Sequence, residues 1–206
     1  MTFKTEQEAF WAGDFGTDYI KRNQGNALLA SNLDFFANAL RRTRNIKSCI
    51  EFGANIGMNL KALNLLHPSI DMHAIEINAE AARQLGAIMP LAQVYNTSIL
   101  DFAPIRQWDL TLIKGVLIHI NPDMLSKVYE KLVTSTGRYL MVAEYYNPAP
   151  VAISYRGHSD RLFKRDFAGE IMDRYPQMKL VDYGFAYHRD PSFPQDDITW
   201  FLMEKH

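Results

Sequence analysis

The stretch IEFGANIG at residues 50–57 joins an apolar run to a tight turn that contains two glycines. The run to which it belongs, 46–52, is rich in β-branched and aromatic residues and predicts a buried strand, while the apolar periodicity of 57–66 predicts a helix. Glycine in such a turn lets the backbone approach a ligand without a side-chain clash, and the amides at the helix N-terminus attract polar groups. The stretch therefore predicts a strand, a turn and a helix, with either a ligand or only a chain reversal at the turn.

Strand-like runs alternate with helical segments from residue 46 onward, which is the arrangement of parallel strands joined by crossover helices. The further strands are predicted at 71–77, 92–96, 109–113 and 138–145, and the intervening helices at 57–66, 78–88 and 122–134. After a helix near 164–175, strand-like runs at 178–187 and 197–204 flank a link with two prolines, which favours an antiparallel hairpin. We therefore expect an α/β fold with a mostly parallel sheet that ends in this hairpin.

The composition limits the kinds of partner that the chain can have. Its 206 residues are 48% hydrophobic with a formal net charge of −1, so we expect one domain over 1–206. A near-neutral chain offers no basic face to phosphates, which argues against nucleic acid. No run approaches a membrane span, and the single cysteine, Cys49, cannot form an internal disulfide. We expect a cytoplasmic protein with a small-molecule substrate and no membrane partner, and the oligomeric state is left open.

The turn at 50–57 resembles the motif with which class I methyltransferases bind S-adenosylmethionine (SAM), usually acidic-x-Gly-x-Gly-x-Gly. Glu51 occupies the acidic position, and Asn55 replaces the middle glycine between Gly53 and Gly57. Asparagine tolerates unusual backbone angles better than most residues. The rival dinucleotide motif, Gly-x-Gly-x-x-Gly, would require glycine at 53, 55 and 58, and two of these positions lack it. The resemblance implies a Rossmann-like three-layer sandwich, with Glu51 holding the methionine ammonium and S-adenosylhomocysteine (SAH) as the product.

The resemblance implies further cofactor contacts at the ends of the next strands. Glu76 ends the second predicted strand, where its carboxylate could accept both ribose hydroxyls, although alone it would equally suit a solvated strand end. Ser98 and Ile99 match the positions that contact the adenine amino group and ring. The cofactor-binding candidates are Glu51, Gly53, Asn55, Gly57, Glu76, Ile77, Ser98, Ile99 and Lys114.

The fourth predicted strand runs into KGVLIHI at 114–120, which resembles the segment that borders the transferred methyl group. His119 is a candidate base, although a histidine among aliphatic residues also suits a packed structural position. Lys114 is open to the same choice. Glu144 and His158 are the other catalytic candidates, because either could take a proton from a hydroxyl or amine. The acidic residues and histidines lack metal-like spacing, so we expect no metal.

Several stretches resemble the bacterial methyltransferases associated with pseudaminic acid biosynthesis: FWAGDFGTDYIKRN, IEFGANIGMN, EYYNP, KRDFAGE and DYGFAYHRDPSFPQDDITWF. This resemblance implies a nonulosonic (pseudaminic-type) sugar or a related surface-glycan intermediate as the methyl acceptor. The segment 146–166 is then a substrate-side insertion, with a solvated loop as the alternative. The substrate-binding candidates are Tyr145, Tyr146, Asn147, His158 and Arg161.

The N-terminal segment 1–42 combines aromatic residues between glycines with a helix predicted at 25–42. This segment could fold over a ligand as a lid, or it could close one end of the core. Two functional alternatives also stay open. One is a SAM-fold transferase that moves a group other than methyl, and the other is a non-catalytic SAM-binding subunit that activates a partner enzyme.

Overall fold

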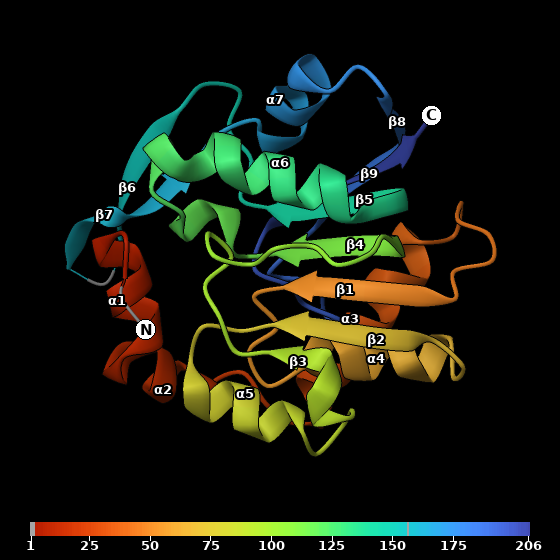
Figure 1. Cartoon of the computed structure of the whole chain (residues 1–206), viewed down its shortest axis with the longest axis horizontal. Helices are drawn as coiled ribbons and strands as arrows, with labels where there is room; N and C mark the ends of the chain where they lie inside the picture. The colour runs from red at the N-terminus through yellow and green to blue at the C-terminus, as the bar shows by residue number, and fades with distance from the viewer. Residues whose placement is uncertain (1–2, 156) are drawn as a thin grey trace.

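The alternation of strands and helices produces a seven-stranded sheet in the computed structural model, which describes residues 3–155 and 157–206, apart from the side chains of Ala92 and residues 158–160. The strand order is β3-β2-β1-β4-β5-β9-β8 (Figure 1). β1 to β5 are parallel, and β9 runs antiparallel to both of its neighbours. The strands span Ser48–Phe52 (β1), Asp71–Ile75 (β2), Val94–Tyr95 (β3), Trp108–Lys114 (β4), Thr136–Glu144 (β5), Met178–Ala186 (β8) and Ile198–Lys205 (β9). The predicted parallel sheet with its C-terminal hairpin is confirmed.

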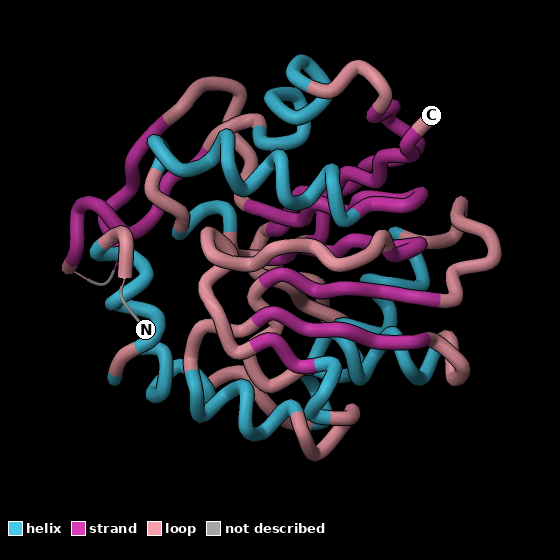
Figure 2. Tube along the Cα trace, viewed as in Figure 1, coloured by secondary structure: helices cyan, strands magenta, loops and turns pink. Residues whose placement is uncertain are grey.

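Helices cover both faces of this sheet, which makes a three-layer sandwich (Figures 1 and 2). Successive side chains of a strand point to opposite faces of the sheet. Every residue of β1 is buried, so both faces of this strand are covered. Cys49 packs with Phe36 and Leu60 on the α3–α4 side, and Ile50 packs with Leu132 on the α6–α7 side. The helices span Glu6–Ala12 (α1), Asp14–Ile20 (α2), Asn26–Ala39 (α3), Met58–Leu66 (α4), Ala79–Leu85 (α5), Leu125–Ser135 (α6) and Phe167–Arg174 (α7).

The order of the strands fixes where a ligand can bind. β2 and β4 lie on opposite sides of β1, because the chain crosses to the other half of the sheet after β3. At such a switch point the loops that follow neighbouring strands diverge, which leaves a crevice at their carboxyl ends. Phe52, the last residue of β1, is in register with Ile75 of β2 and Ile113 of β4, so the loops after all three strands begin at one edge.

Two segments outside the sheet lie at this same edge (Figure 1). α1 and α2 are formed by the aromatic N-terminal segment, and the 146–166 segment contains a two-stranded antiparallel sheet of β6 (Val151–Tyr155) and β7 (His158–Lys164). The aromatic rings of Phe15 and Tyr155, which are 6.3 Å apart, join the two segments. Within the described part of this segment, β6 and β7 form a hairpin, and most residues of β6 are exposed to solvent.

The observed boundaries differ from the predicted ones where turns compete with regular structure. β3 has only two residues, because the 3-10 turn η1 at Leu91–Gln93 takes up the start of the predicted strand. The helix predicted at 122–134 begins as a second 3-10 turn, η3 (Pro122–Met124), which Asn121 caps. The helix predicted at 78–88 ends at Leu85, followed by Gly86. In the described part of the chain, no helix combines the length and apolar character that crossing a membrane requires.

Candidate active site

The glycine turn after β1 holds three residues in the left-handed region of backbone space. Gly53 has φ +79°, Asn55 +48° and Gly57 +80°. A Cβ at Gly53 would lie 2.6 Å from a methyl group of Val116, and a Cβ at Gly57 would lie 2.3 Å from Ile88. Both glycines are therefore required by the chain itself, through backbone conformation and close packing. Asn55, the departure from the motif, has a conformation that asparagine adopts more readily than most residues.

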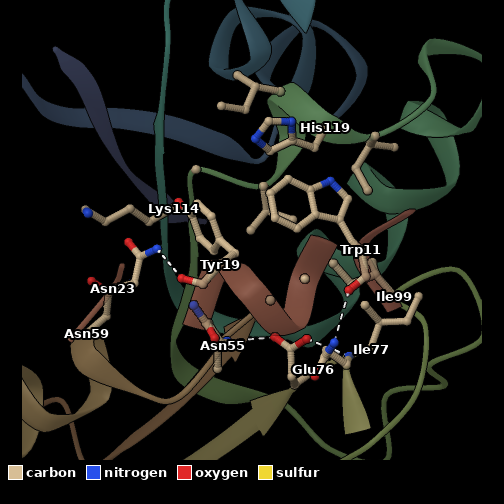
Figure 3. A pocket seen from close by; sticks show the side chains of 18 of the residues that line it. Trp11, Tyr19, Asn23, Asn55, Asn59, Glu76, Ile77, Ile99, Lys114 and His119 are labelled. Atoms are coloured by element: carbon tan, nitrogen blue, oxygen red, sulfur yellow. Dashed lines mark hydrogen bonds between the residues drawn. The ribbon is translucent and has the colours of Figure 1, made fainter. Parts of the chain in front are cut away.

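Glu76 follows β2 directly across from this turn (Figure 3). Its Oε2 accepts a hydrogen bond from the backbone amide of Asn55 at 2.7 Å, and its Oε1 accepts one from the amide of Asn78 at 2.7 Å. The carboxyl group is 7% exposed and lines the pocket, and burial raises its pKa. The backbone amide of Ile77 also donates to this carboxyl group. The two carboxylate oxygens offer about four acceptor sites in all, so the group can still accept a hydrogen bond from a ligand.

Glu51, at the end of β1, lies behind the pocket. It is fully buried, and burial raises its pKa to about 8. Its Oε1 accepts a hydrogen bond from Asn59 Nδ2 at 2.6 Å, and its Oε2 has no partner among the described residues. Asn59 itself lines the pocket, so its side-chain amide lies between Glu51 and the space where a ligand would bind.

Lys114 ends β4 and lines the opposite side of the pocket (Figure 3). Burial lowers the pKa of its ammonium, while Glu51, Asp196 and Glu144 raise it. Its Nζ also lies 5.4 Å from the ring centre of Phe35. This half-buried ammonium group offers a positive charge to an anionic group that enters the pocket.

His119, on the 3-10 turn η2 (Leu117–His119), is clamped between two aromatic rings. Its ring centre lies 4.6 Å from that of Trp11 and 5.2 Å from that of Tyr155. Its Nδ1 is 2.6 Å from the carbonyl oxygen of Arg161. Because a carbonyl only accepts, Nδ1 carries the proton, which leaves the lone pair of the neutral ring on Nε2. Burial lowers the pKa of this imidazole to about 4.

Glu144 supports the loop that carries His119. Its Oε1 accepts hydrogen bonds from the backbone amides of Val116 and Leu117 at 3.0 and 2.9 Å, and its side chain is 3% exposed. Burial raises its pKa to about 7. In this position Glu144 holds the backbone after β4, behind the side chains that face the pocket.

The N-terminal helices form one wall of the pocket. Asn78 caps α5 with its oxygen, and its Nδ2 lies within 3.1–3.4 Å of three carbonyls at 11–13 and of the Thr17 hydroxyl. Trp11 and Tyr19 enter the pocket from this wall, opposite Glu76 and Ile77 (Figure 3). The segment 1–42 thus contributes directly to the space where a ligand would bind.

The substrate candidates on the other side divide into two groups. Tyr145 lines the pocket, whereas Tyr146 is 42% exposed and packs against Phe201. Asn147 donates to the carbonyl of Ala149, and the Arg161 guanidinium lies 3.2 Å from Glu6 of α1. The side chain of His158 lies outside the described part of the structure.

The pocket has a volume of about 270 Å³. It brings together seven of the predicted cofactor residues, and the catalytic candidate His119 and the substrate candidate Tyr145 with them. The seven are Gly53, Asn55, Glu76, Ile77, Ser98, Ile99 and Lys114. Glu51 and Gly57 lie behind these residues. The pocket is also lined by polar and aromatic residues that were not among the predicted site residues: Glu8, Trp11, Tyr19, Asn23, Asn32, Asn59, Asn78, Tyr155, Gln195 and Asp196.

No protein-family model matches the chain, and a comparison with curated proteins finds no match. Solved structures share its architecture. A SAM-dependent methyltransferase from Leishmania major is 14% identical, with a TM-score of 0.71 over 98% of this chain and 82% of that one. The 1,6-didemethyltoxoflavin-N1-methyltransferase from Burkholderia thailandensis, solved with bound 1,6-didemethyltoxoflavin and SAH, is 16% identical, with a TM-score of 0.69 over 100% and 91%.

A third similar structure is the magnesium protoporphyrin IX methyltransferase from Synechocystis PCC 6803 with bound SAM. It is 9% identical, with a TM-score of 0.68 over the full length of both chains. At such low identities the likeness concerns the fold and not the chemistry. The chain has the class I methyltransferase fold.

Proposed function

We propose that this protein is a SAM-dependent methyltransferase that acts on a small polar acceptor. The observation that carries the proposal is Glu76, a carboxylate fixed by the amides of Asn55 and Asn78 beside a glycine turn, at the switch point of a methyltransferase fold. This carboxylate can still accept a hydrogen bond from the hydroxyls of a ribose. Similar structures bind SAM or SAH, which supports the same cofactor here.

The methionine end of SAM fits the other polar groups of the pocket. Asn59 donates to Glu51, so its own carbonyl oxygen is left to accept from the methionine ammonium. The unpartnered Oε2 of Glu51 supplies the balancing negative charge once the ammonium binds. Lys114 would hold the methionine carboxylate. The chain's residues thus offer a partner for each charged group at this end of the cofactor.

The reaction that this site supports is in-line displacement. SAM supplies a methyl group on a sulfonium: a lone pair of the acceptor bonds to the methyl carbon while the carbon–sulfur electron pair stays on sulfur. His119 takes the proton that a hydroxyl or amine acceptor loses, through the lone pair on Nε2. Trp11 and Tyr155 fix its ring and exclude water. We assign Glu144 the support of the His119 loop, and the catalytic role of His158 stays a prediction.

The acceptor that we propose is a nonulosonic, pseudaminic-type sugar or a related surface-glycan intermediate. Support for this comes from the resemblance of the N-terminal and C-terminal stretches described above. Polar and aromatic groups of Tyr145, Tyr155 and Asp196 line the pocket beyond Lys114, which suits a polar molecule. We propose that 1–206 forms one domain, with 1–42 as a lid and 146–166 on the substrate side. A cytoplasmic location agrees with the single buried thiol, Cys49.

Labelled SAM tests the proposal directly. The protein is incubated with it and with a panel of nonulosonic acid intermediates, and mass spectrometry looks for a methyl-sized gain on one of them. We expect transfer with the wild type and a loss of transfer with His119→Asn. Binding of SAH without transfer to any intermediate, alone or with neighbouring enzymes, would instead support a non-catalytic SAM-binding subunit.

A further inference from the structure

A buried carboxylate outside the predicted cofactor motifs lines the pocket at its β3 side. Glu8, on α1, is 7% exposed, although acidic residues are rarely buried unless paired. Its Oε1 accepts a hydrogen bond from the hydroxyl of Ser98, which follows β3. A residue near the N-terminus and a residue ninety positions later therefore meet inside the pocket.

The hydrogen bonds of Glu8 leave one acceptor position open. Its Oε2 accepts from the backbone amides of Lys4 and Thr5 in the capping box of α1, which uses both of its lone pairs. Among the described residues its Oε1 accepts from Ser98 alone, and it keeps one lone pair. The Ser98 hydroxyl, whose proton points at Glu8, in turn accepts from the amide of Leu100 at 2.9 Å. This end of the pocket can therefore accept a hydrogen bond, and the side chain of Ser98 has no donor left to offer.

The surroundings of this acceptor are apolar. Ile77, Ile99 and Leu100 line the pocket next to it. The other acidic side chain of the loop, Asp101, is paired with Lys4 and is not among the residues that line the pocket. Apolar side chains with the Glu8 carboxylate as an acceptor beside them suit a heterocycle that carries an amino donor.

We propose that Glu8 accepts a hydrogen bond from the exocyclic amino group of the SAM adenine, so that the N-terminal helix takes part in recognising the base. The inference rests on the proposed function, since Glu76 at the ribose places the base beyond it on the β3 side. Ser98 is a positioning residue that aims the carboxylate. Hypoxanthine carries an oxygen acceptor in place of the amino group, and that oxygen would face the negative charge of Glu8.

Calorimetry with two ligands tests this assignment. SAH carries adenine, and S-inosylhomocysteine carries hypoxanthine on the same scaffold. We expect the wild type to bind SAH at least about tenfold more tightly, which is the scale of one charge-assisted hydrogen bond. In Glu8→Gln the preference should fall to within about threefold, because the amide can rotate and donate to the hypoxanthine oxygen. Glutamine also suits the third position of a capping box, so α1 should stay capped.

Asp101→Asn is the matched control. It weakens the contact of the same loop with Lys4, and hence the seating of α1, without removing the acceptor at the base. This variant should keep the wild-type preference for SAH. A wild type that binds both ligands equally, or a Glu8→Gln variant that keeps the full preference, overturns the assignment while leaving the methyltransferase proposal intact. A wild type that binds neither ligand overturns both.

Discussion

The side of the pocket next to β1 and β2 and the side next to β4 and β5 are built in different ways. On the first side, Gly53 and Glu76 come from short stretches that directly follow strands, and backbone amides hold them in place. On the second side, His119 depends on Trp11, Tyr155 and the carbonyl of Arg161, which come from the N-terminal segment and from the 146–166 segment. Each residue of the first side is positioned by the strand that it follows. The second side forms only when segments that are distant in the sequence pack together. Substitutions on the two sides should therefore have different consequences.

His119→Asn should produce the largest effect, confined to turnover. Asparagine Nδ2 lies where histidine Nδ1 does, so it can still donate to the Arg161 carbonyl, but the basic nitrogen is lost. We expect the rate of methyl transfer to fall by about 100- to 10,000-fold, the usual contribution of general base catalysis. The affinity for SAH should stay within about twofold, or roughly 0.4 kcal/mol, by calorimetry.

The pH dependence of the wild-type rate checks the same assignment. Because burial lowers the pKa of His119 to about 4, the ring is neutral at higher pH, and its protonation should slow the reaction only below about pH 5. This acid limb should be missing from any residual activity of His119→Asn. Wild-type turnover in that variant would remove His119 from the chemistry and leave it as a packed residue.

Gly53→Val should instead damage the fold and the cofactor site together. The left-handed conformation and the overlap with Val116 add strain and overpacking, which lower the free energy of unfolding by about 2–4 kcal/mol. Urea denaturation measures this loss. Adding Val116→Ala should restore the part that is due to overlap. Normal stability with abolished SAH binding would show that the position limits the ligand and not the turn.

Glu76→Ala should weaken SAH binding by about 1.5–3 kcal/mol, the scale for hydrogen bonds to a charged group. The variant also frees the amides of Asn55 and Asn78, so unfolding curves are needed beside calorimetry. Glu80→Ala, which removes an acidic side chain paired with Arg83 on the surface of α5, is the control and should bind normally. Unchanged affinity in a folded Glu76→Ala variant would place the ribose elsewhere.

Glu51→Gln should change how stability depends on pH. Burial raises the pKa of Glu51 to about 8 in the folded protein, so the folded state holds a proton that the unfolded state releases above about pH 4.5. Wild-type stability should therefore fall between these values as the pH rises. The glutamine variant should match the wild type near pH 4 and exceed it by at least about 1 kcal/mol near pH 9. Parallel curves for the two proteins would mean that Glu51 ionises normally.

The same contrast explains what the sequence could predict. The sheet and the turn were predictable because the central strands β1, β4 and β5 are largely buried and mostly apolar, and because the turn contains glycine at 53 and 57. Glu76 was predictable from its place at the end of a strand. The β6–β7 hairpin was not predicted, since its first strand is almost wholly exposed and lacks the alternation that a half-buried strand shows.

The residues that sequence analysis missed are those whose role depends on contacts between distant segments. In the sequence, Glu8 is an ordinary capping-box glutamate. Its side chain lies in the pocket only because α1 packs against the loop after β3. Asn59 lies on α4 just after the glycine turn, and it gains its role from the buried Glu51 beside it. Asn78 caps α5, yet its amide also fastens the N-terminal helices. Each of these residues has an ordinary local role, and its role in the pocket arises only from tertiary contacts that the sequence does not show.

The smallest effect should come from Tyr146→Ala, which tests which of the substrate candidates contact the acceptor. Tyr146 is 42% exposed and packs on Phe201, whereas its neighbour Tyr145 lines the pocket. An acceptor that extends past the pocket would contact Tyr146 only at its edge, so we expect catalytic efficiency to fall by about three- to fivefold, or roughly 1 kcal/mol. Tyr145→Phe, which removes one hydroxyl inside the pocket, should cost more than this.

Steady-state kinetics with the methylated intermediate measures both variants, and SAH affinity within about twofold of wild type shows that the cofactor side is intact. Leu180→Ala, which removes an exposed hydrophobic side chain from the edge strand β8, serves as the control for lost surface area. If Tyr146→Ala behaves like this control while Tyr145→Phe is impaired, the acceptor ends inside the pocket. The residues beyond Tyr145 then belong to the surface, and the acceptor is held by the side chains that surround His119.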